Sequence, residues 1–176
     1  GCGSIIKPAA LTPLTTLLTV ELMAEAGVPR ELMRVVTTNS ASAFSEAVLA
    51  DPRVRKISFT GSTGVGSTLM GLAAKNIVKS SMELGGNAPL IVFDDADLER
   101  AVEGTLAAKM RNGGQSCVAA NRIYVQDGIA DAFAEAFTER MSQVVLGNSI
   151  ADGVTLGPVI DQRAVDNFSH LVSDAV

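Results

Sequence analysis

The sequence predicts an α/β protein, in which a parallel sheet carries helices and leads into the start of a second α/β domain. Short apolar runs alternate with longer amphipathic runs through the first half of the chain, as in parallel strands joined by helices. A glycine-containing turn at residues 61–66 joins an expected strand to an expected helix. Apolar residues make up 47% of the sequence and charged residues 19%, which supports a packed core and argues against disorder.

The first half is expected to follow the order βαβαβα. After a strand at residues 4–7, Thr12 is a candidate N-cap and Pro13 suits the first turn of a helix. Apolar residues at helical spacing form one face of this helix, and Gly27 ends it. That face consists of Leu14, Leu17, Leu18, Leu22 and Met23. The further strands are expected at residues 32–36 and 56–60, and the further helices at residues 41–50 and after residue 66.

After Ser80 the pattern changes, and we place a domain boundary near Gly85, dividing the chain into residues 1–84 and 85–176. Asp97 is the expected cap of a helix that runs to about Met110. The expected strands are at residues 81–84, 88–93 and 122–125, and the expected helices continue at 131–145 and 162–176. Because the sequence opens on a strand and stops inside a helical pattern, we expect the chain to be incomplete.

Composition and charge exclude several classes of function. The formal charge is -5 and the basic residues are scattered, so nucleic acid is not an expected partner. Two cysteines and one histidine give neither a disulfide framework nor a zinc site. No apolar run approaches the roughly 20 residues of a membrane helix, and no signal peptide is apparent. We therefore expect a cytoplasmic protein without a membrane partner.

The turn at residues 61–66 is a candidate phosphate site. Gly61, Ser62 and Gly66 lie between a strand and a helix, where backbone amides can approach an anion. The segment matches neither the Walker A motif nor the dinucleotide fingerprint. From these residues alone, a turn that merely connects two elements remains an open alternative.

Cys117 is the candidate nucleophile. It stands in Gly113-Gly114-Gln115-Ser116-Cys117, where a loop exposes the thiol and nearby amides can stabilise an oxyanion. A buried structural cysteine is the alternative, and we assign that role to Cys2. Glu83, expected to be partly buried at the end of a strand, is a candidate general base, although an ordinary ion-paired glutamate is equally compatible. His170 would allow a cysteine–histidine hydrolase but fits a surface or packing position better.

Two cations are candidates for ligand binding. Lys7 follows the first strand, and ligands of open α/β sheets gather at the carboxyl ends of strands. Arg111 lies shortly before Cys117 and could either complement a helix C-terminus or hold a substrate carboxylate. Both side chains could equally be solvated.

Three segments together resemble the aldehyde dehydrogenase superfamily over essentially the whole chain. They are Lys7-Pro8-Ala9, Phe59-Thr60-Gly61-Ser62-Thr63 with Gly66, and Glu83-Leu84-Gly85-Gly86 followed by Gly114-Gln115-Ser116-Cys117. The resemblance implies the Rossmann-like sheet of that fold, incomplete, in residues 1–84 as the later part of a nicotinamide-nucleotide-binding domain. It implies the first part of a catalytic domain in residues 85–176.

The resemblance also implies a mechanism and a cofactor, NADP or NAD. Cys117 would form a thiohemiacetal and then a thioester, and Glu83 would activate the hydrolytic water. Ser62 would meet the pyrophosphate and Lys7 the adenine ribose, with further cofactor contacts at Gly61, Gly66 and Leu84. An acidic residue often stands three places after the lysine, and here that residue is Ala10. Without a carboxylate to repel a 2′-phosphate, we expect tolerance of NADP or preference for it.

Within the superfamily the chain is most similar to succinate-semialdehyde dehydrogenases, in which an arginine at the Arg111 position helps to hold the distal carboxylate of the substrate. Relatives are usually dimers or tetramers. An upstream asparagine and a downstream Glu-x-Phe-Gly-Pro segment of the family are absent, so we expect weak cofactor binding and little turnover by the isolated chain. A coenzyme A-acylating enzyme and a non-catalytic nucleotide-binding remnant are the alternatives.

Overall fold

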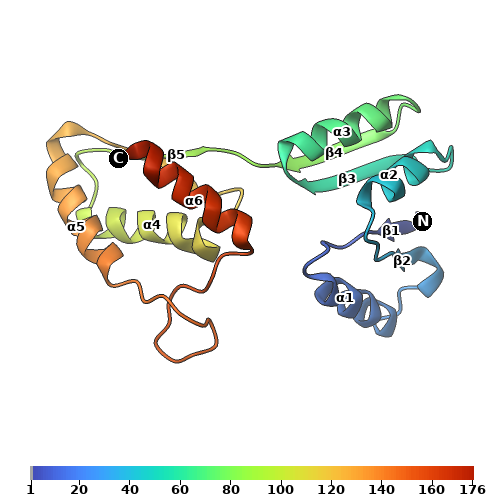
Figure 1. The fold of residues 1–176 in the computed structure, drawn as a ribbon, viewed down its shortest axis with the longest axis horizontal. Helices are drawn as coiled ribbons and strands as arrows, with labels where there is room; N and C mark the ends of the chain where they lie inside the picture. The colour runs from blue at the N-terminus through green and yellow to red at the C-terminus, as the bar shows by residue number, and fades with distance from the viewer. Residues whose placement is uncertain (1) are drawn as a thin grey trace. The chain divides into compact units, whose positions relative to one another are not determined.

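The computed structural model describes residues 2–176 and confirms the α/β class. The chain forms two compact units that divide between Glu83 and Leu84. Each unit contains parallel strands covered by helices, coloured blue to green in the first and green to red in the second (Figure 1). No helix of the described residues is long and apolar enough to cross a membrane.

The first unit begins with a small parallel sheet. Strand β1 (Ser4–Ile6) pairs with β2 (Met33–Val35), and between them lie helix α1 (Pro13–Glu25) and a 3-10 turn, η1 (Arg30–Leu32). Gly27 ends α1 as expected, because its φ of 99° lies in the left-handed region that glycine adopts freely. Thr12 occupies the N-cap position, but its side chain makes no capping hydrogen bond.

The predicted apolar face of α1 is present, but it is largely exposed among the described residues. None of its residues is buried, and Leu14 and Leu18 are 77% and 60% exposed. Periodicity identifies a helix and its apolar side, but it does not supply the partner that buries it.

The second sheet of this unit is built around a core of four buried residues. Strand β3 (Lys56–Gly61) pairs with β4 (Lys79–Leu84), and helices α2 (Ala41–Ala50) and α3 (Thr63–Ala74) accompany the pair (Figure 1). Leu49, Leu69, Ala73 and Val78 form the core. The run of alternating elements is as predicted, but the strands form two separate pairs and no ladder joins β1–β2 to β3–β4 among residues 2–83. Instead, residues of β1 and β3 line a common cavity.

The second unit has a parallel pair covered by two helices. Strand β5 (Ala88–Val92) pairs with β6 (Ala120–Val125), and helices α4 (Leu98–Met110) and α5 (Ala130–Ser142) pack on it, with a 3-10 turn, η3 (Asp127–Ile129), before α5. Val92, Val102 and Phe133 are buried together, and the Phe133 and Phe137 rings stack at 5.7 Å. The side chain of Asp97 caps α4 as expected, accepting a hydrogen bond from the Arg100 amide. Helix α5 ends three residues earlier than residue 145.

A long loop and a final helix complete the second unit. Residues 143–161 form a loop that is closed by a parallel bridge between Leu146 and Leu156, and α6 (Gln162–Ala175) follows (Figure 1). Asp161 caps α6 by accepting a hydrogen bond from the Ala164 amide at 3.1 Å. The helix is strongly amphipathic, and its apolar residues Phe168 and Leu171 are 44% and 55% exposed.

Candidate functional site

The first unit contains a largely apolar cavity of about 400 Å³ between α2 and α3, with β1 and β3 contributing to its walls. Small-molecule pockets typically enclose about 300–1,000 Å³. Phe59, Val48 and Val65 supply flat or branched apolar surface, and two lysines, Lys7 and Lys56, are among the lining residues. The cavity can therefore hold an aromatic ring system that carries a negatively charged group.

Lys7 lies directly after β1, and its side chain is half-buried. Its Nζ donates a hydrogen bond to the carbonyl oxygen of Pro8 at 2.6 Å. The ammonium has further donors beyond this bond. Since no acidic partner is paired with Lys7 among the described residues, those donors can be used for a ligand.

The turn at residues 61–66 is shaped for close backbone approach. A Cβ at Gly61 would lie 2.5 Å from the ring of Phe59, so a larger residue there would require that ring to move. Ser62 is the N-cap of α3, with its Oγ accepting a hydrogen bond from the Val65 amide at 3.4 Å. Gly66 is buried and its amide donates to the Ser62 carbonyl oxygen at 2.9 Å. The exposed first turn of α3 thus offers amide donors next to the cavity, where they suit a phosphate.

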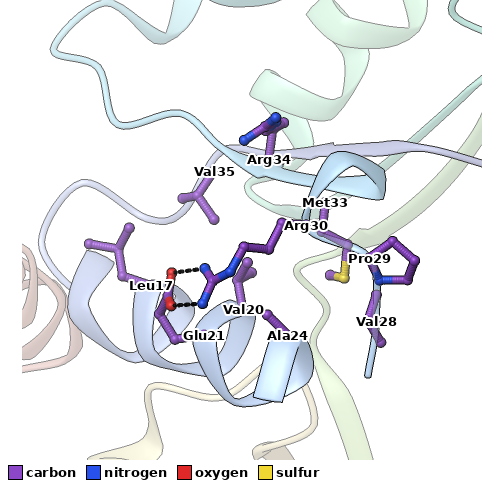
Figure 2. A pocket seen from close by; sticks show the side chains of 10 residues that line it. All are labelled: Leu17, Val20, Glu21, Ala24, Val28, Pro29, Arg30, Met33, Arg34 and Val35. Atoms are coloured by element: carbon purple, nitrogen blue, oxygen red, sulfur yellow. Dashed lines mark hydrogen bonds and ion pairs between the residues drawn. The ribbon is translucent and has the colours of Figure 1, made fainter. Parts of the chain in front are cut away.

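A second cavity of the first unit, about 240 Å³, lies between α1 and β2 (Figure 2). Arg30 and Glu21 form a two-pronged ion pair at this cavity, with Nη1 to Oε1 at 2.9 Å and Nη2 to Oε2 at 2.8 Å. Hydrogen bonding to Arg30, and then its charge, lowers the pKa of the Glu21 carboxyl. Because the two charges satisfy each other, this cavity offers no free charged group from that pair.

Cys117 lies in a turn of the second unit, as the glycine-rich sequence predicted, and is exposed. Residues 116–119 form this thiol turn, closed by a hydrogen bond from the Ala119 amide to the Ser116 carbonyl oxygen at 3.1 Å. It is preceded by the left-handed turn, residues 112–114, which lies within η2 (Arg111–Gly114). There Asn112, Gly113 and Gly114 have φ values of 53°, 64° and 75°. Beside the thiol turn, a Cβ at Gly86 would come within 3.7 Å of the Cys117 carbonyl oxygen.

Glu83 lies on β4 and is exposed, so the predicted partial burial is wrong for the described residues. Burial alternates along the end of this strand, with Met82 and Leu84 half-buried and Glu83 on the opposite face. Nothing in residues 2–176 covers that face. Glu83 belongs to the first unit and Cys117 to the second, and each lies at the surface of its own unit.

Two arginines of the second unit have different surroundings. Arg111 follows the C-terminus of α4 and is exposed, with no ion pair among residues 2–176. Arg122 donates two hydrogen bonds to the Asn87 carbonyl oxygen, from Nε at 3.0 Å and Nη2 at 2.8 Å. Arg122 therefore fixes the chain just after Gly85-Gly86, whereas Arg111 keeps its donors available.

The remaining candidates fall outside any site. His170 is exposed on α6, which agrees with a surface position. Cys2 is exposed rather than buried, so the structural role assigned to it is not supported by burial. Within residues 2–176, no three histidine, cysteine or carboxylate side chains gather in a way that could hold a metal ion.

Sequence reasoning missed most of the lining of the larger cavity. Its α3 wall consists of Val65, Thr68, Leu69 and Leu72. These positions have the i, i+3, i+4, i+7 spacing of one helix face, which the sequence contains. That pattern predicts an inward face, but it does not distinguish a packed core from a cavity.

Comparison with known proteins covers the whole chain. The model of the aldehyde dehydrogenase family matches residues 1–176. The chain is 55% identical over all its residues to mitochondrial succinate-semialdehyde dehydrogenase of Arabidopsis thaliana, covering 33% of that protein. It is 52% identical over all its residues to the NADP⁺-dependent succinate-semialdehyde dehydrogenase GabD of Escherichia coli, covering 36%.

Among solved structures, the chain is similar to an NADP-dependent enzyme of E. coli with a TM-score of 0.95 and 52% identity. The match covers 99% of this chain and 36% of that one. The chain thus spans about a third of the length of the relatives that it matches.

Proposed function

Because the chain belongs to the aldehyde dehydrogenase family, we propose that it carries the reactive cysteine of an enzyme that oxidises an aldehyde to its carboxylic acid with NADP or NAD. The observation that carries this proposal is the exposed thiol of Cys117 in a tight turn next to three left-handed residues. A turn of this kind presents a side chain to a substrate while its flanking backbone remains fixed. Residues 1–84 would belong to the nucleotide-binding domain and residues 85–176 to the catalytic domain.

The thiolate of Cys117 adds to the aldehyde carbon, and the new carbon–sulfur bond turns the carbonyl oxygen into an oxyanion. The backbone amide of Cys117 is the candidate donor to that oxygen. Loss of a hydride from the same carbon restores the carbonyl and leaves a thioester on Cys117. The nicotinamide, when bound, supplies the hydride acceptor.

Glu83 completes the reaction by taking a proton from water, which attacks the thioester carbon. The carbon–sulfur bond breaks, the acid leaves, and the Cys117 thiolate is regenerated. Without a general base to activate water, the thioester would persist until another nucleophile, such as the thiol of coenzyme A, accepted the acyl group. The presence of Glu83 therefore favours hydrolysis over the acylating alternative.

The cavity of the first unit supports the cofactor assignment. Its apolar lining suits an adenine ring, the first turn of α3 with Ser62 suits the pyrophosphate, and Lys7 suits the adenine ribose. Gly61 and Gly66 allow the close backbone approach, and Leu84 is the further contact that the resemblance implies. Ala10 is exposed and brings no carboxylate to repel a 2′-phosphate, so the proposal includes use of NADP.

Succinic semialdehyde, the substrate named for the two relatives, is the proposed aldehyde. Arg111 is exposed and unpaired among residues 2–176, and its planar guanidinium can bind a carboxylate through two parallel hydrogen bonds. An aldehyde with an anion at its far end would thereby be held with its carbonyl towards Cys117. In the full-length protein we expect a homodimer or homotetramer.

The test compares two aldehydes in the purified full-length protein. With NADP⁺, succinic semialdehyde should be oxidised at a much lower KM than neutral butanal, with or without coenzyme A. Arg111→Ala should raise the KM for succinic semialdehyde by about tenfold or more, as expected for a lost charge-assisted hydrogen bond, and should leave butanal unaffected. Arg100→Ala, an exposed arginine on α4, is the matched control. Equal effects on both aldehydes, or a requirement for coenzyme A, would contradict the proposal.

A further inference from the structure

We propose that Gln115 is a positioning residue, which fixes the thiol turn of Cys117 by fastening the left-handed turn to the chain at Ile160. The inference deepens the proposed function and rests on it for the role of the cysteine. Gln115 itself is not expected to touch the aldehyde or the cofactor.

Both ends of the Gln115 side-chain amide are hydrogen-bonded. Its Nε2 donates to the Asn112 carbonyl oxygen at 3.1 Å, and its Oε1 accepts from the Ile160 amide at 3.0 Å. The backbone amide of Gln115 also donates to the Asn112 carbonyl oxygen, at 3.1 Å, and Asn112 Nδ2 donates to the Gln115 carbonyl oxygen at 3.3 Å. This half-buried side chain therefore joins two segments that lie far apart in the sequence.

The left-handed turn consists of two glycines and one residue with a Cβ, Asn112. Asn112 has a φ of 53°, a conformation that asparagine adopts more readily than other residues with a Cβ, so the hydrogen bonds of Gln115 reinforce a local preference. The turn follows the last residue of α4 and lies within the short 3-10 helix η2, which is closed by a hydrogen bond from the Gln115 amide to the Asn112 carbonyl oxygen. The bonds from Gln115 to Asn112 are the contacts that close it.

The thiol turn is held differently at its two ends. Downstream, Ala119 and Ala120 are 2% and 3% exposed and lead directly into β6, so that end is anchored in packed structure. Upstream, the residue that adjoins the thiol turn is Gln115, whose contacts are the hydrogen bonds described above. The position of Cys117 relative to β6 thus depends on the Gln115 link.

The loop that contains Ile160, at the other end of the Gln115 hydrogen bonds, has a contact of its own that holds it closed. Residues 143–161, the orange loop between α5 and α6 in Figure 1, are closed by the bridge between Leu146 and Leu156. Leu156 Cδ1 lies 3.3 Å from where a Cβ would stand on Gly113. The loop therefore meets the left-handed turn at two points, one apolar and one through Gln115.

Hydrogen exchange at two amides tests the link directly. In the ¹⁵N-labelled chain, Gln115→Ala should speed exchange of the Ile160 amide by about tenfold, as expected for the loss of one side-chain hydrogen bond. If Gln115 positions the thiol turn, the Ala119 amide should also exchange several-fold faster, although it makes no bond to Gln115. An unchanged exchange rate at the Ala119 amide would overturn the proposal, because the substitution would then affect only the amide whose hydrogen bond is lost.

Gln115→Glu tests the two hydrogen bonds of the side-chain amide separately. The carboxylate can still accept from Ile160, which should stay protected, but it cannot donate to Asn112, so exchange at Ala119 should remain fast. Wild-type protection of Ala119 in this variant would overturn the role of the Asn112 bond. Gln126→Ala is the matched control, because Gln126 accepts from the Asp94 amide at 3.1 Å, away from the thiol turn.

Kinetics of the full-length protein add a functional readout. Gln115→Ala should lower kcat by about tenfold with the KM for NADP⁺ unchanged, whereas Gln126→Ala should leave both parameters near wild type. A kcat for Gln115→Ala equal to that of Gln126→Ala would contradict the positioning role. If the wild-type protein oxidises no aldehyde, the proposed function fails, while the exchange at Ala119 still decides whether Gln115 positions the turn.

Discussion

Replacing Gly114 by alanine tests how strongly the backbone before Cys117 depends on glycine. Gly114 has a φ of 75°, and a Cβ there would lie 3.3 Å from the carbonyl oxygen of Lys109. The left-handed conformation costs a residue with a Cβ about 1–2 kcal/mol. Because the neighbouring atom belongs to the backbone of α4, the contact adds to this strain. We expect Gly114→Ala to lower the free energy of unfolding of the second unit by about 2 kcal/mol.

Two other glycines of the second unit separate the cost of the left-handed backbone from the cost of the contact with Lys109. Gly153 has a φ of 77° with no atom within 4 Å of the added Cβ, so Gly153→Ala should show the strain alone. Gly104 lies inside α4 with open space around it, and Gly104→Ala should stabilise the unit by about 0.5–1 kcal/mol through helix propensity. The expected order of stability is therefore Gly104→Ala, wild type, Gly153→Ala and Gly114→Ala.

Urea unfolding followed by tyrosine fluorescence measures this order. The chain has one tyrosine and no tryptophan, and Tyr124 lies in β6, so the signal reports on the second unit. Midpoints and slopes give the free energies by linear extrapolation. If Gly114→Ala unfolded at the wild-type midpoint or above it, the reasoning from φ and the Lys109 contact would be refuted.

Three further predictions concern the cofactor site, a helix cap and a titrating group. Lys7→Ala should weaken NADP⁺ binding, measured by calorimetry, by about tenfold more than NAD⁺ binding, and equal losses would exclude a contact with the 2′-phosphate. Asp161→Ala removes the cap of α6 and should cost about 1 kcal/mol of helix stability, visible as faster amide exchange at Ala164. Hydrogen bonds from Arg53 lower the pKa of the Asp51 carboxyl from 3.8 to about 2. The ionised carboxylate therefore stabilises the folded state at pH values above the pKa of the unfolded chain, and this stabilisation is lost as the pH falls towards 2. A carboxyl NMR titration should show that midpoint, and Arg53→Ala should return it towards 3.8.

Local sequence signals predicted the elements well because each element has a local cause. Pro13, Gly27 and Asp97 lie at helix ends where their backbone preferences or side chains act within a few residues. The loop position of Cys117 followed from the glycines before it. Patterns of this kind need no knowledge of the rest of the fold.

What could not be predicted depends on contacts between distant residues. The exposure of Glu83 and of the α1 leucines reflects which segments cover them, and that is not encoded within β4 or α1 themselves. The hydrogen bonds of Gln115 to Ile160 and of Arg122 to Asn87 join positions that are many residues apart. The sequence motif predicts the cysteine as the nucleophile, whereas the hydrogen bonds of the neighbouring Gln115 could be found only in the structure.

The most direct test of the central claim is to trap the covalent intermediate on Cys117. The full-length Glu83→Gln variant is incubated with NADP⁺ and succinic semialdehyde, quenched in acid, digested and analysed by mass spectrometry. We predict that a succinyl group accumulates on the peptide that contains Cys117, because the thioester forms but its hydrolysis lacks the base, and that the wild-type protein shows little. Reduction of NADP⁺ without an acyl group on Cys117 in either protein would contradict the account.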